Sequence, residues 1–413
     1  MKLTTRLIRF EPMEKYTVII PTRDRAETLE ATLRTCLRQA YKYYEIVVSD
    51  NCSVDNTKEI VERFNDPRIR YINPGRRLSM SGNFEFALGH VTEGFVMFIG
   101  SDDGIMPGAI DYVDSIVKKF QVDAVSCSQA TYVWPDFPDE QIASRLTFGG
   151  LRNHVEIRRS SEWLEKTLNF QVPYCFDLPN LYCGFVHKRV IDKAYKDGQY
   201  FRSITPDAYS AFATAIFIDK YAFSYRPFSI AGASSKSNGA SAMHPVGDAS
   251  EATKFFQEND IEFSEGFINC PSYEVIAAEA YAQLEKAFPD LCEPYHINYE
   301  AMLAAATANS NERTEDVIKN AVAKMAVNFG VNIRQVSYRK KTRHSDVFSM
   351  INRVLVNLIS PRPVAVERST DVGVNNIDDA ALVAHLLLEK QRKGMVTTSR
   401  DLIKAILKQR MGF

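Results

Sequence analysis

Short apolar runs alternate with amphipathic stretches over the first part of the chain. Four mainly apolar runs are bounded by polar residues, and they lie at Thr17–Ile20, Glu45–Val48, Ile69–Ile72 and Phe95–Ile99. After each run, apolar residues recur every three or four positions, which is the spacing of one face of an α-helix. Buried strands that alternate with such helices predict an α/β fold, with a mostly parallel sheet covered by helices on both faces. Sheets of this kind bind ligands at the carboxyl ends of their strands.

The pattern changes after the fourth run. Residues 130–202 are less regular and contain clustered proline and aromatic residues, and we interpret them as acceptor-side elements of the same domain. A helix is predicted to begin near Thr205–Asp207, and a loop rich in serine, glycine and asparagine follows at Ser229–His244. Further on, the spacing of apolar residues is mostly helical. The sequence therefore predicts a first domain over residues 1–250 and a mostly helical C-terminal region over residues 251–413.

Composition and charge narrow the class of protein. Of the 413 residues, 45% are hydrophobic and 24% are charged, which is typical of a folded soluble protein. Lys and Arg number 50 against 51 Asp and Glu, so the chain has no overall field that would favour nucleic acid. No run approaches the ~18 consecutive apolar residues of a membrane-spanning helix. Seven cysteines without metal-like spacing, and no signal peptide at the start, predict reduced thiols in the cytoplasm.

Polar and charged residues follow three of the predicted strands, at the point where each strand ends. They lie in the segments Ile19–Arg25, Val47–Thr57 and Phe98–Gly104. A buried strand does not need such groups for packing. We therefore expect ligand-binding side chains at this edge of the sheet.

Three segments, taken in order, resemble family-2 glycosyltransferases. They are VVSDNCSVDNT (Val47–Thr57), RLSMSGNFEFAL (Arg77–Leu88) and IGSDDGIMPGAI (Ile99–Ile110). The resemblance is close over the first third of the chain and weaker beyond it. It implies a GT-A fold with a Rossmann-like sheet, and an inverting, hexosyltransferase-like enzyme. Such an enzyme moves a sugar from a nucleotide-diphosphate donor to a glycan or lipid-linked acceptor, in bacterial surface polysaccharide biosynthesis.

Asp50 is the residue expected to bind the base of the nucleotide. It follows the second predicted strand, where its carboxylate can accept the ring N–H of a pyrimidine or guanine, and the matching Asp of the family binds the base. The alternative is a turn residue that caps the next helix. Asp55 or Asn56 is better placed for that cap, so we favour the binding role.

Other residues near the first and third strands are expected to line the nucleotide pocket. Pro21 ends the first strand, and Thr22 and Arg23 close it. Arg23 can equally be a solvated surface charge. Asn83, at the start of a helix, is expected either to present its amide to the nucleotide or to cap that helix.

Ser101, Asp102 and Asp103 directly follow the fourth strand. Two adjacent carboxylates repel each other unless a cation or hydrogen-bond donors neutralise them. Mg²⁺ or Mn²⁺ bound between Asp103 and the diphosphate would do so and would stabilise the leaving group. By resemblance this is the D-x-D motif, with Asp103 as metal ligand, Asp102 near the ribose or the metal, and Ser101 near the nucleotide. Ser101 stands where the family usually has an Asp, and a simple turn is the alternative.

Asp207 is the candidate catalytic base. An inverting transfer needs a base for the proton of the acceptor hydroxyl, and the run Ser203–Ala213 resembles the acidic motif of the family at this place. Thr205 as cap and Pro206 at the first helical position would fix Asp207 in the first turn. The helix dipole lowers the pKa of a carboxyl there, whereas burial raises it. The alternative is an Asp that only stabilises the start of the helix.

The polar loop after this helix is expected to close over the diphosphate. Lys236, Ser237 and Asn238 would then contact phosphate, and His244 would reach the metal. A solvated histidine in a loop is the alternative for His244.

Two basic stretches lie near the C-terminus, at Tyr338–His344 and Arg400–Phe413. Basic amphipathic stretches can lie on an anionic membrane, which predicts peripheral contact with the inner face of the membrane. Packing against the catalytic domain or against a partner subunit is the alternative.

Two other functions are consistent with parts of this pattern. A sugar nucleotidyltransferase uses a related sheet, but it needs a glycine-rich phosphate loop after the first strand, and Pro21–Thr28 contains no glycine. A non-catalytic nucleotide- or glycan-binding module would follow if Ser101 removed metal binding.

Overall fold

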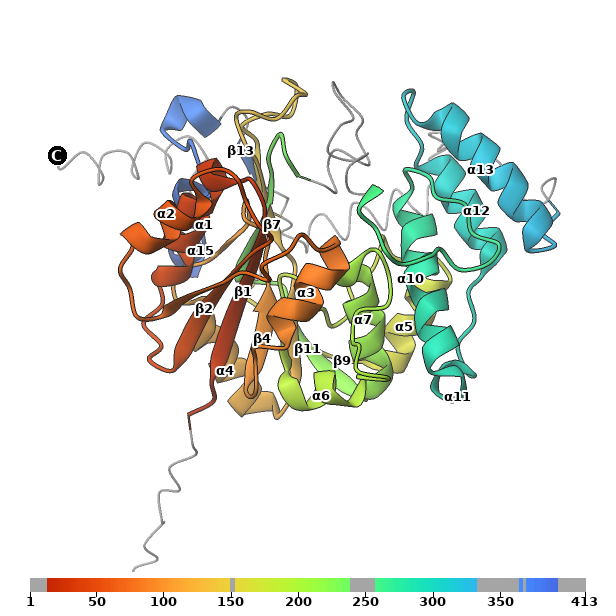
Figure 1. The fold of residues 1–413 in the computed structure, drawn as a ribbon, viewed down its shortest axis with the longest axis horizontal. Helices are drawn as coiled ribbons and strands as arrows, with labels where there is room; N and C mark the ends of the chain where they lie inside the picture. Colours follow the sequence, from red (N-terminus) through yellow and green to blue (C-terminus); the bar gives the residue numbers. More distant parts are fainter. Residues whose placement is uncertain (1–12, 149–152, 238–256, 333–363, 367–368, 393–413) are drawn as a thin grey trace, which may run out of the picture.

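The computed structural model describes residues 13–148, 153–237, 257–332, 364–366 and 369–392 (Figure 1). Several predictions concern residues outside these ranges and stay predictions. They are Asn238, His244, the boundary near residue 250, and the basic stretches Tyr338–His344 and Arg400–Phe413.

An eight-stranded sheet forms the centre of the molecule, in the order β3-β2-β1-β4-β10-β6-β11-β9. Strands β3, β2, β1 and β4 are mutually parallel, whereas β10 is antiparallel to both of its neighbours. These strands are β1 (Tyr16–Thr22), β2 (Tyr44–Asp50), β3 (Ile69–Ile72), β4 (Phe95–Phe98), β6 (Ala124–Cys127), β9 (Val155–Arg159), β10 (Phe185–His187) and β11 (Lys220–Ser224). The predicted α/β fold with a mostly parallel sheet is therefore confirmed.

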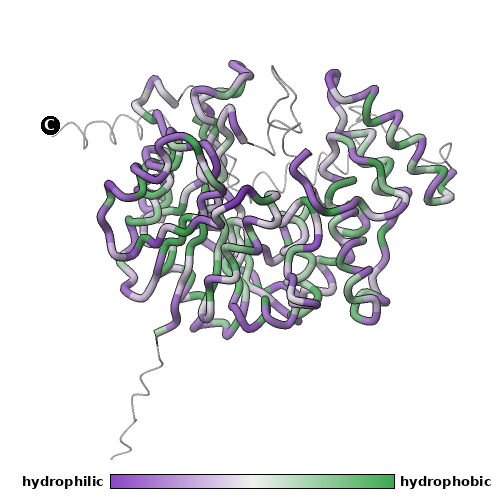
Figure 2. Tube along the Cα trace, viewed as in Figure 1, coloured by the Kyte–Doolittle hydropathy of each residue, from purple (hydrophilic) through white to green (hydrophobic). Residues whose placement is uncertain are grey.

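Helices cover both faces of this sheet (Figure 1). Because successive side chains of a strand point to opposite faces, Val18 and Ile20 of β1 belong to one apolar core and Ile19 to the other. The first core contains α1 (Ala26–Leu37) and α4 (Ala109–Phe120); the second contains α3 (Met80–Leu88), α5 (Ser160–Leu168), α6 (Lys188–Lys193) and α7 (Pro206–Phe217). Helix α2 (Thr57–Arg63) lies between β2 and β3 in the chain. Figure 2 shows apolar residues concentrated in the strands and inner helical turns, and hydrophilic residues in the loops.

A second, five-stranded sheet has the order β13-β8-β7-β12-β5. Its strands are β5 (Gly104–Ile105), β7 (Ala130–Val133), β8 (Leu146–Phe148), β12 (Ser229–Ala233) and β13 (Val364–Val366). The sequence did not predict this sheet, because its strands are two to five residues long and are drawn from distant segments. The segment Ser229–His244 was predicted to be a loop, but its first five residues form β12, because they pair with β5 and β7. β5 directly follows Asp103, so the pairing of β12 with β5 brings the two segments together.

Four helices among the described residues extend the second core beyond α7 (Figure 1). They are α10 (Tyr273–Ala287), α11 (Pro289–Cys292), α12 (Tyr299–Ala308) and α13 (Glu315–Asn328). The chain then returns to the first core through β13, a 3₁₀ turn (Ser369–Val372) and α15 (Ile377–Arg392). Arg38, at the end of α1, forms two hydrogen bonds of 2.7 Å with the Asp378 carboxylate of α15. In the described ranges, no helix has both the length and the apolar content needed to cross a membrane.

Candidate active site

Strands β1 and β2 end side by side, at the edge where the sequence predicts polar groups. The register pairs Pro21 with Ser49 and Thr22 with Asp50. Thr22 is only 4% exposed, and its hydroxyl has no hydrogen-bond partner among the described residues. Ser101, which follows β4, is 1% exposed, and its hydroxyl also lacks a hydrogen-bond partner among the described residues. A buried hydroxyl normally has a partner, so these two groups mark places where a ligand can supply one.

Asp50 is buried at the end of β2. Its Oδ2 accepts a hydrogen bond of 2.6 Å from the Tyr71 hydroxyl, and its Oδ1 accepts one of 2.9 Å from the Ser53 N–H. Burial and the hydrogen bond to Asp50 raise the pKa of Tyr71 to about 12. The carboxylate is therefore held in place by a donor on each oxygen.

The start of α2 confirms one expectation about capping. The Asp55 carboxylate accepts hydrogen bonds from the backbone N–H of Thr57 at 3.1 Å and of Ala26 at 2.9 Å. It therefore satisfies a donor at the start of both α1 and α2. Asn56 occupies the N-cap position of α2 without a side-chain cap.

Asn83 faces β2. Its Oδ1 accepts a hydrogen bond of 2.8 Å from the Ser49 hydroxyl, and its Nδ2 donates one of 3.2 Å to the Ser49 carbonyl. The cap of α3 is Ser79, which accepts a hydrogen bond of 3.0 Å from the Gly82 N–H. The expectation that Asn83 caps its helix is therefore wrong, and its amide links α3 to β2.

Asp103 is 1% exposed and has a donor on each oxygen. Oδ2 accepts hydrogen bonds from the Gly100 N–H at 2.7 Å and from the Tyr182 hydroxyl at 2.5 Å. Oδ1 accepts one of 2.7 Å from the Gly232 N–H of β12. Burial, and then the charge of Asp102, raise the pKa of Asp103 to about 6.

Asp102 holds the start of the polar loop through one oxygen. Its Oδ2 accepts hydrogen bonds from the Ser234 hydroxyl at 2.8 Å and from the Ser237 hydroxyl. No protein donor in the described ranges lies on its Oδ1. The hydroxyl of Ser237, which was predicted to contact phosphate, donates to Asp102 instead. The Oδ1 oxygen of Asp102 accepts no hydrogen bond from the described residues and can bind a ligand.

Basic side chains at this edge are paired with acidic ones. Arg23 pairs with Glu258, and Arg77 lies 3.1 Å from Asp24 and 3.6 Å from Glu258. Lys236 of the polar loop lies 2.5 Å from Glu27 in the first turn of α1. The Lys236 ammonium also donates a hydrogen bond of 3.1 Å to the Asp24 carbonyl, so Lys236 lies near Arg23, 213 positions away in the chain.

Asp207 lies in the first turn of α7, after Pro206. Its side chain is partly exposed, and its Oδ2 accepts a hydrogen bond of 3.1 Å from the Tyr174 hydroxyl. Burial raises the pKa of Asp207, although it lies at a helix N-terminus. Thr205 occupies the cap position but makes no side-chain capping bond.

Asn180 connects the turn of Asp207 with that of Asp103. Its Oδ1 accepts hydrogen bonds from the Ser210 hydroxyl of α7 at 2.9 Å and from the Tyr182 N–H at 2.8 Å. Tyr182 in turn donates to Asp103. The charges of Asp103 and Asp207 both contribute, after burial, to the raised pKa of the Cys183 thiol. Both carboxylates therefore lie within electrostatic reach of the same thiol.

Tyr174, Asn180 and Tyr182 were missed by the sequence interpretation. They lie in an irregular segment without periodicity, and only its proline and aromatic content distinguished it. Their contacts with Asp207, Ser210 and Asp103 join residues 30 to 79 positions apart, which no local pattern encodes.

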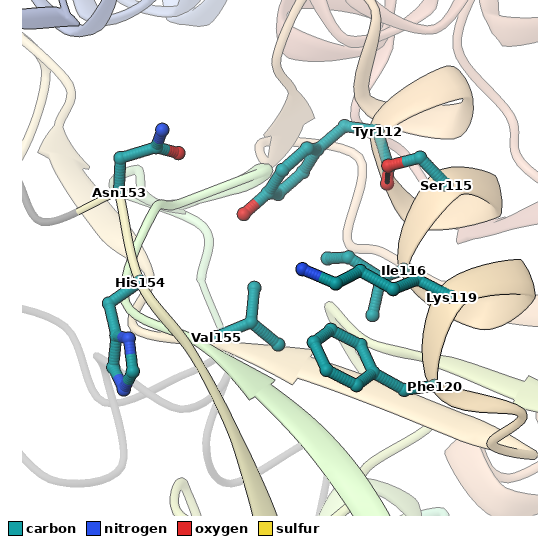
Figure 3. Close-up of a pocket in the computed structure, with 8 residues that line it drawn as sticks. All are labelled: Tyr112, Ser115, Ile116, Lys119, Phe120, Asn153, His154 and Val155. Carbon is teal, nitrogen blue, oxygen red and sulfur yellow. Dashed lines mark hydrogen bonds between the residues drawn. The ribbon is translucent and has the colours of Figure 1, made fainter.

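A cavity of about 440 Å³ lies elsewhere, between α4 and the start of β9 (Figure 3). Tyr112 and Lys119 point into it from α4, opposite His154 and Val155. It contains no carboxylate and none of the predicted site residues. The candidate reaction site is therefore the carboxyl edge of the sheet. Across the described parts of the chain, no three His, Cys, Asp or Glu side chains cluster as a metal site.

Comparison with known proteins finds similar glycosyltransferases. Residues 17–176 match the model of the family described as "Glycosyl transferase family 2". A Campylobacter jejuni protein named GalNAc(5)-diNAcBac-PP-undecaprenol beta-1,3-glucosyltransferase is 36% identical over 101 residues, which are 24% of this chain and 33% of the relative. Escherichia coli WfaP, named UDP-Glc:alpha-D-GlcNAc-diphosphoundecaprenol beta-1,3-glucosyltransferase, is 26% identical over 168 residues, which are 39% of this chain and 66% of the relative. The chain thus spans between one third and about two thirds of these relatives.

Among solved structures, Staphylococcus aureus TarS 1–349 in complex with UDP-GlcNAc is similar to this chain. It is 15% identical, with a TM-score of 0.42, over 80% of this chain and 93% of that one.

Proposed function

We propose that this protein, whose residues 17–176 match the model of glycosyl transferase family 2, transfers a sugar from a nucleoside-diphosphate donor to a glycan or lipid-linked acceptor, with inversion. One observation carries the proposal. The hydrogen bonds of Asn180 and Tyr182 join the turn of the buried Asp102–Asp103 pair to that of Asp207, a partly exposed carboxyl of raised pKa. Donor and acceptor groups can therefore meet at one edge of the sheet.

The nucleoside is proposed to bind over the ends of β1, β2 and β4. Asp50 would accept a hydrogen bond from the base. Thr22 and Ser101 hold buried hydroxyls that lack partners among the described residues, and a nucleotide can satisfy both. The backbone of Pro21 and the cations Arg23 and Lys236 border the same space.

Of the two adjacent carboxylates, Asp102 fits as the ligand of a divalent cation better than Asp103 does. Asp103 fits poorly, because its two oxygens already accept hydrogen bonds from three protein donors. Asp102 fits, since Oδ1 carries no donor from the described residues, and Mg²⁺ is commonly held by one carboxylate together with substrate phosphates. We therefore infer that Asp102, rather than the Asp103 expected from sequence, would hold Mn²⁺ or Mg²⁺. Such an ion supplies charge neutralisation for the leaving diphosphate.

Asp207 is proposed as the base. Its carboxylate would take the proton of the acceptor hydroxyl while the acceptor oxygen forms its bond to the anomeric carbon. The bond from that carbon to the diphosphate oxygen breaks at the same time, and the diphosphate leaves with the electron pair. A raised pKa makes a carboxylate a stronger base and brings it closer to the working pH.

The acceptor class and the cellular location are proposed from the names of the relatives. Both curated glucosyltransferases described above are named for acceptors carried on undecaprenyl diphosphate. A similar role for this chain would place it in the cytoplasm or at the inner face of the membrane, in bacterial surface polysaccharide assembly. The C-terminal basic stretches would then contact the membrane or another subunit.

Thermal shift with UDP, GDP, dTDP and CDP, each with and without Mn²⁺, tests donor binding, because a ligand stabilises the fold that binds it.

Transfer assays with the matching nucleotide sugar follow, comparing the wild type with Asp207→Asn. We expect the variant to keep its thermal shift and to lose transfer by about 10²-fold or more. Absence of any nucleotide shift, or wild-type transfer by the variant, would refute the proposal. Nucleotide binding without turnover in the wild type would indicate a binding module instead.

A further inference from the structure

Three aromatic side chains form one continuous surface beside α7. The ring of Tyr174 lies 5.1 Å from that of Phe176 and 5.4 Å from that of Tyr273, between centroids. Phe176 is 52% exposed and Tyr273 is 40% exposed, whereas Tyr174 is half-buried between them. Large aromatic side chains that share an exposed surface mark a binding site more often than isolated ones do.

This surface borders the candidate base. The Tyr174 hydroxyl donates to Asp207, and the charge of Asp207 contributes, after burial, to the raised pKa of Tyr273. Both phenol rings therefore lie within electrostatic reach of the carboxylate. Figure 1 shows how this arises, since α7, which carries Asp207, runs beside α10, which begins at Tyr273.

The backbone under these rings is held by buried contacts. Arg158 is 3% exposed and donates hydrogen bonds to the Asp177 carboxylate at 2.8 Å and to its carbonyl at 3.1 Å. The Tyr221 hydroxyl donates to the same carbonyl at 2.5 Å. On the other side, Ser272 caps α10 directly before Tyr273. Phe176 and Tyr273 are thus presented on anchored segments, which lowers the entropic cost of using them for binding.

We propose that Phe176, Tyr174 and Tyr273 form the acceptor subsite, on which one face of a pyranose ring stacks while its hydroxyl points to Asp207. This rests on the proposed role of Asp207 and assigns the substrate class at that position. A pyranose has an apolar C–H face for the rings and polar edges for the phenol hydroxyls and the carboxylate. An alkyl chain on the same surface would desolvate these polar groups without pairing them, which is costly.

The test uses Phe176→Ala and Tyr273→Ala in the full chain. The matched control is Tyr43→Ala, since Tyr43 is 41% exposed and hydrogen bonds to Glu93, away from α7. The acceptor probes are methyl N-acetyl-α-D-glucosaminide, its decyl diphosphate analogue, and decyl diphosphate without a sugar. We expect each variant to raise the KM for both saccharide probes about tenfold, which is 1.4 kcal/mol of binding free energy. The KM of the donor and its hydrolysis without acceptor should not change, and the control should match the wild type.

Replacement by another aromatic residue separates stacking from folding. Phe176→Trp and Tyr273→Trp keep a flat ring and should retain a saccharide KM close to that of the wild type. Unchanged saccharide KM values in both alanine variants would overturn the proposal. It is also overturned if decyl diphosphate competes with saccharide in the wild type and loses that competition in the variants, because the surface then binds the lipid chain.

Failure of the proposed function can be told apart from failure of the subsite. A wild type that neither binds nor hydrolyses any nucleotide sugar refutes the transferase. Saccharide binding is then measured directly, by saturation-transfer NMR with the methyl glycoside. Binding by the wild type that is lost in the alanine variants supports the aromatic subsite, and no binding by the wild type overturns it.

Discussion

The hydroxyl of Tyr182 donates a hydrogen bond of 2.5 Å to Oδ2 of Asp103, 79 positions away in the chain. The backbone supports this contact, because Phe98 at the end of β4 exchanges hydrogen bonds of 2.8 Å with Leu181 and Cys183. With the Gly232 N–H on its other oxygen, Asp103 joins β4, the segment before β10, and β12. Its carboxylate therefore organises the edge of the sheet that the sequence assigned to metal binding.

Replacement of Asp103 by Ala should destabilise the fold. The change leaves the N–H groups of Gly100 and Gly232 and the Tyr182 hydroxyl without their acceptor, so we expect a loss of about 3 kcal/mol in the free energy of unfolding. Urea denaturation measures it. Tyr182→Phe removes a single donor and should cost about 1 kcal/mol. A loss below about 0.5 kcal/mol for Asp103→Ala would contradict the anchoring role.

Asp102→Asn should change the metal requirement rather than the fold. Replacing one carboxylate oxygen by an amide weakens a hard-cation ligand, so we expect the Mn²⁺ concentration for half-maximal transfer to rise about tenfold or more. Titration of activity with Mn²⁺ measures this. In the matched variant Asp103→Asn the metal requirement should change less. If the Mn²⁺ concentration for half-maximal transfer rises more in Asp103→Asn than in Asp102→Asn, Asp103 is the metal ligand instead.

Gly232→Ala should disturb the contact between β12 and the turn of Asp102 and Asp103. A Cβ at Gly232 would lie 1.8 Å from the backbone oxygen of Asp102, so either β12 or the turn that contains Asp102 has to move. We expect a loss of about 2 kcal/mol in stability, as for other overpacked interiors, and weaker donor binding. Thermal unfolding and nucleotide titration check both effects. The control is Gly89→Ala, where the nearest atom would be 3.4 Å away, and equal behaviour of the two variants would argue against the contact.

Tyr174→Phe should shift the pH dependence of transfer. The hydrogen bond from Tyr174 lowers the pKa of Asp207 against the larger, opposite effect of burial, so its removal raises that pKa further. A base acts only when it is deprotonated, and activity falls as the pH drops through its pKa. The acidic limb of kcat/KM should therefore move to higher pH in the variant. An unmoved limb, in a variant with normal thermal stability, would show that Asp207 does not titrate in the reaction.

The strands β1 to β4 and the helices between them follow directly from the chain. Their apolar runs are continuous and the amphipathic spacing is regular, so local pattern suffices to predict them. The position of Asp207 in the first turn of α7 follows equally from Pro206. The five-stranded sheet does not follow, because its strands are short and β13 comes from residues more than 200 positions after β8. Short pairings of this kind depend on what the rest of the fold places beside them.

The sequence alone determined that acidic and hydroxyl side chains collect where parallel strands end, because the carboxyl ends of such strands share one edge. Only the tertiary structure decided how those side chains are used. Asp102 and Asp103 are adjacent in the chain, yet Asp103 is enclosed by three donors and Asp102 keeps an oxygen open. That difference comes from Tyr182 and Gly232, which reach Asp103 from distant segments. The chemistry of a carboxylate is set by its surrounding donors and burial, and these are properties of the packed chain.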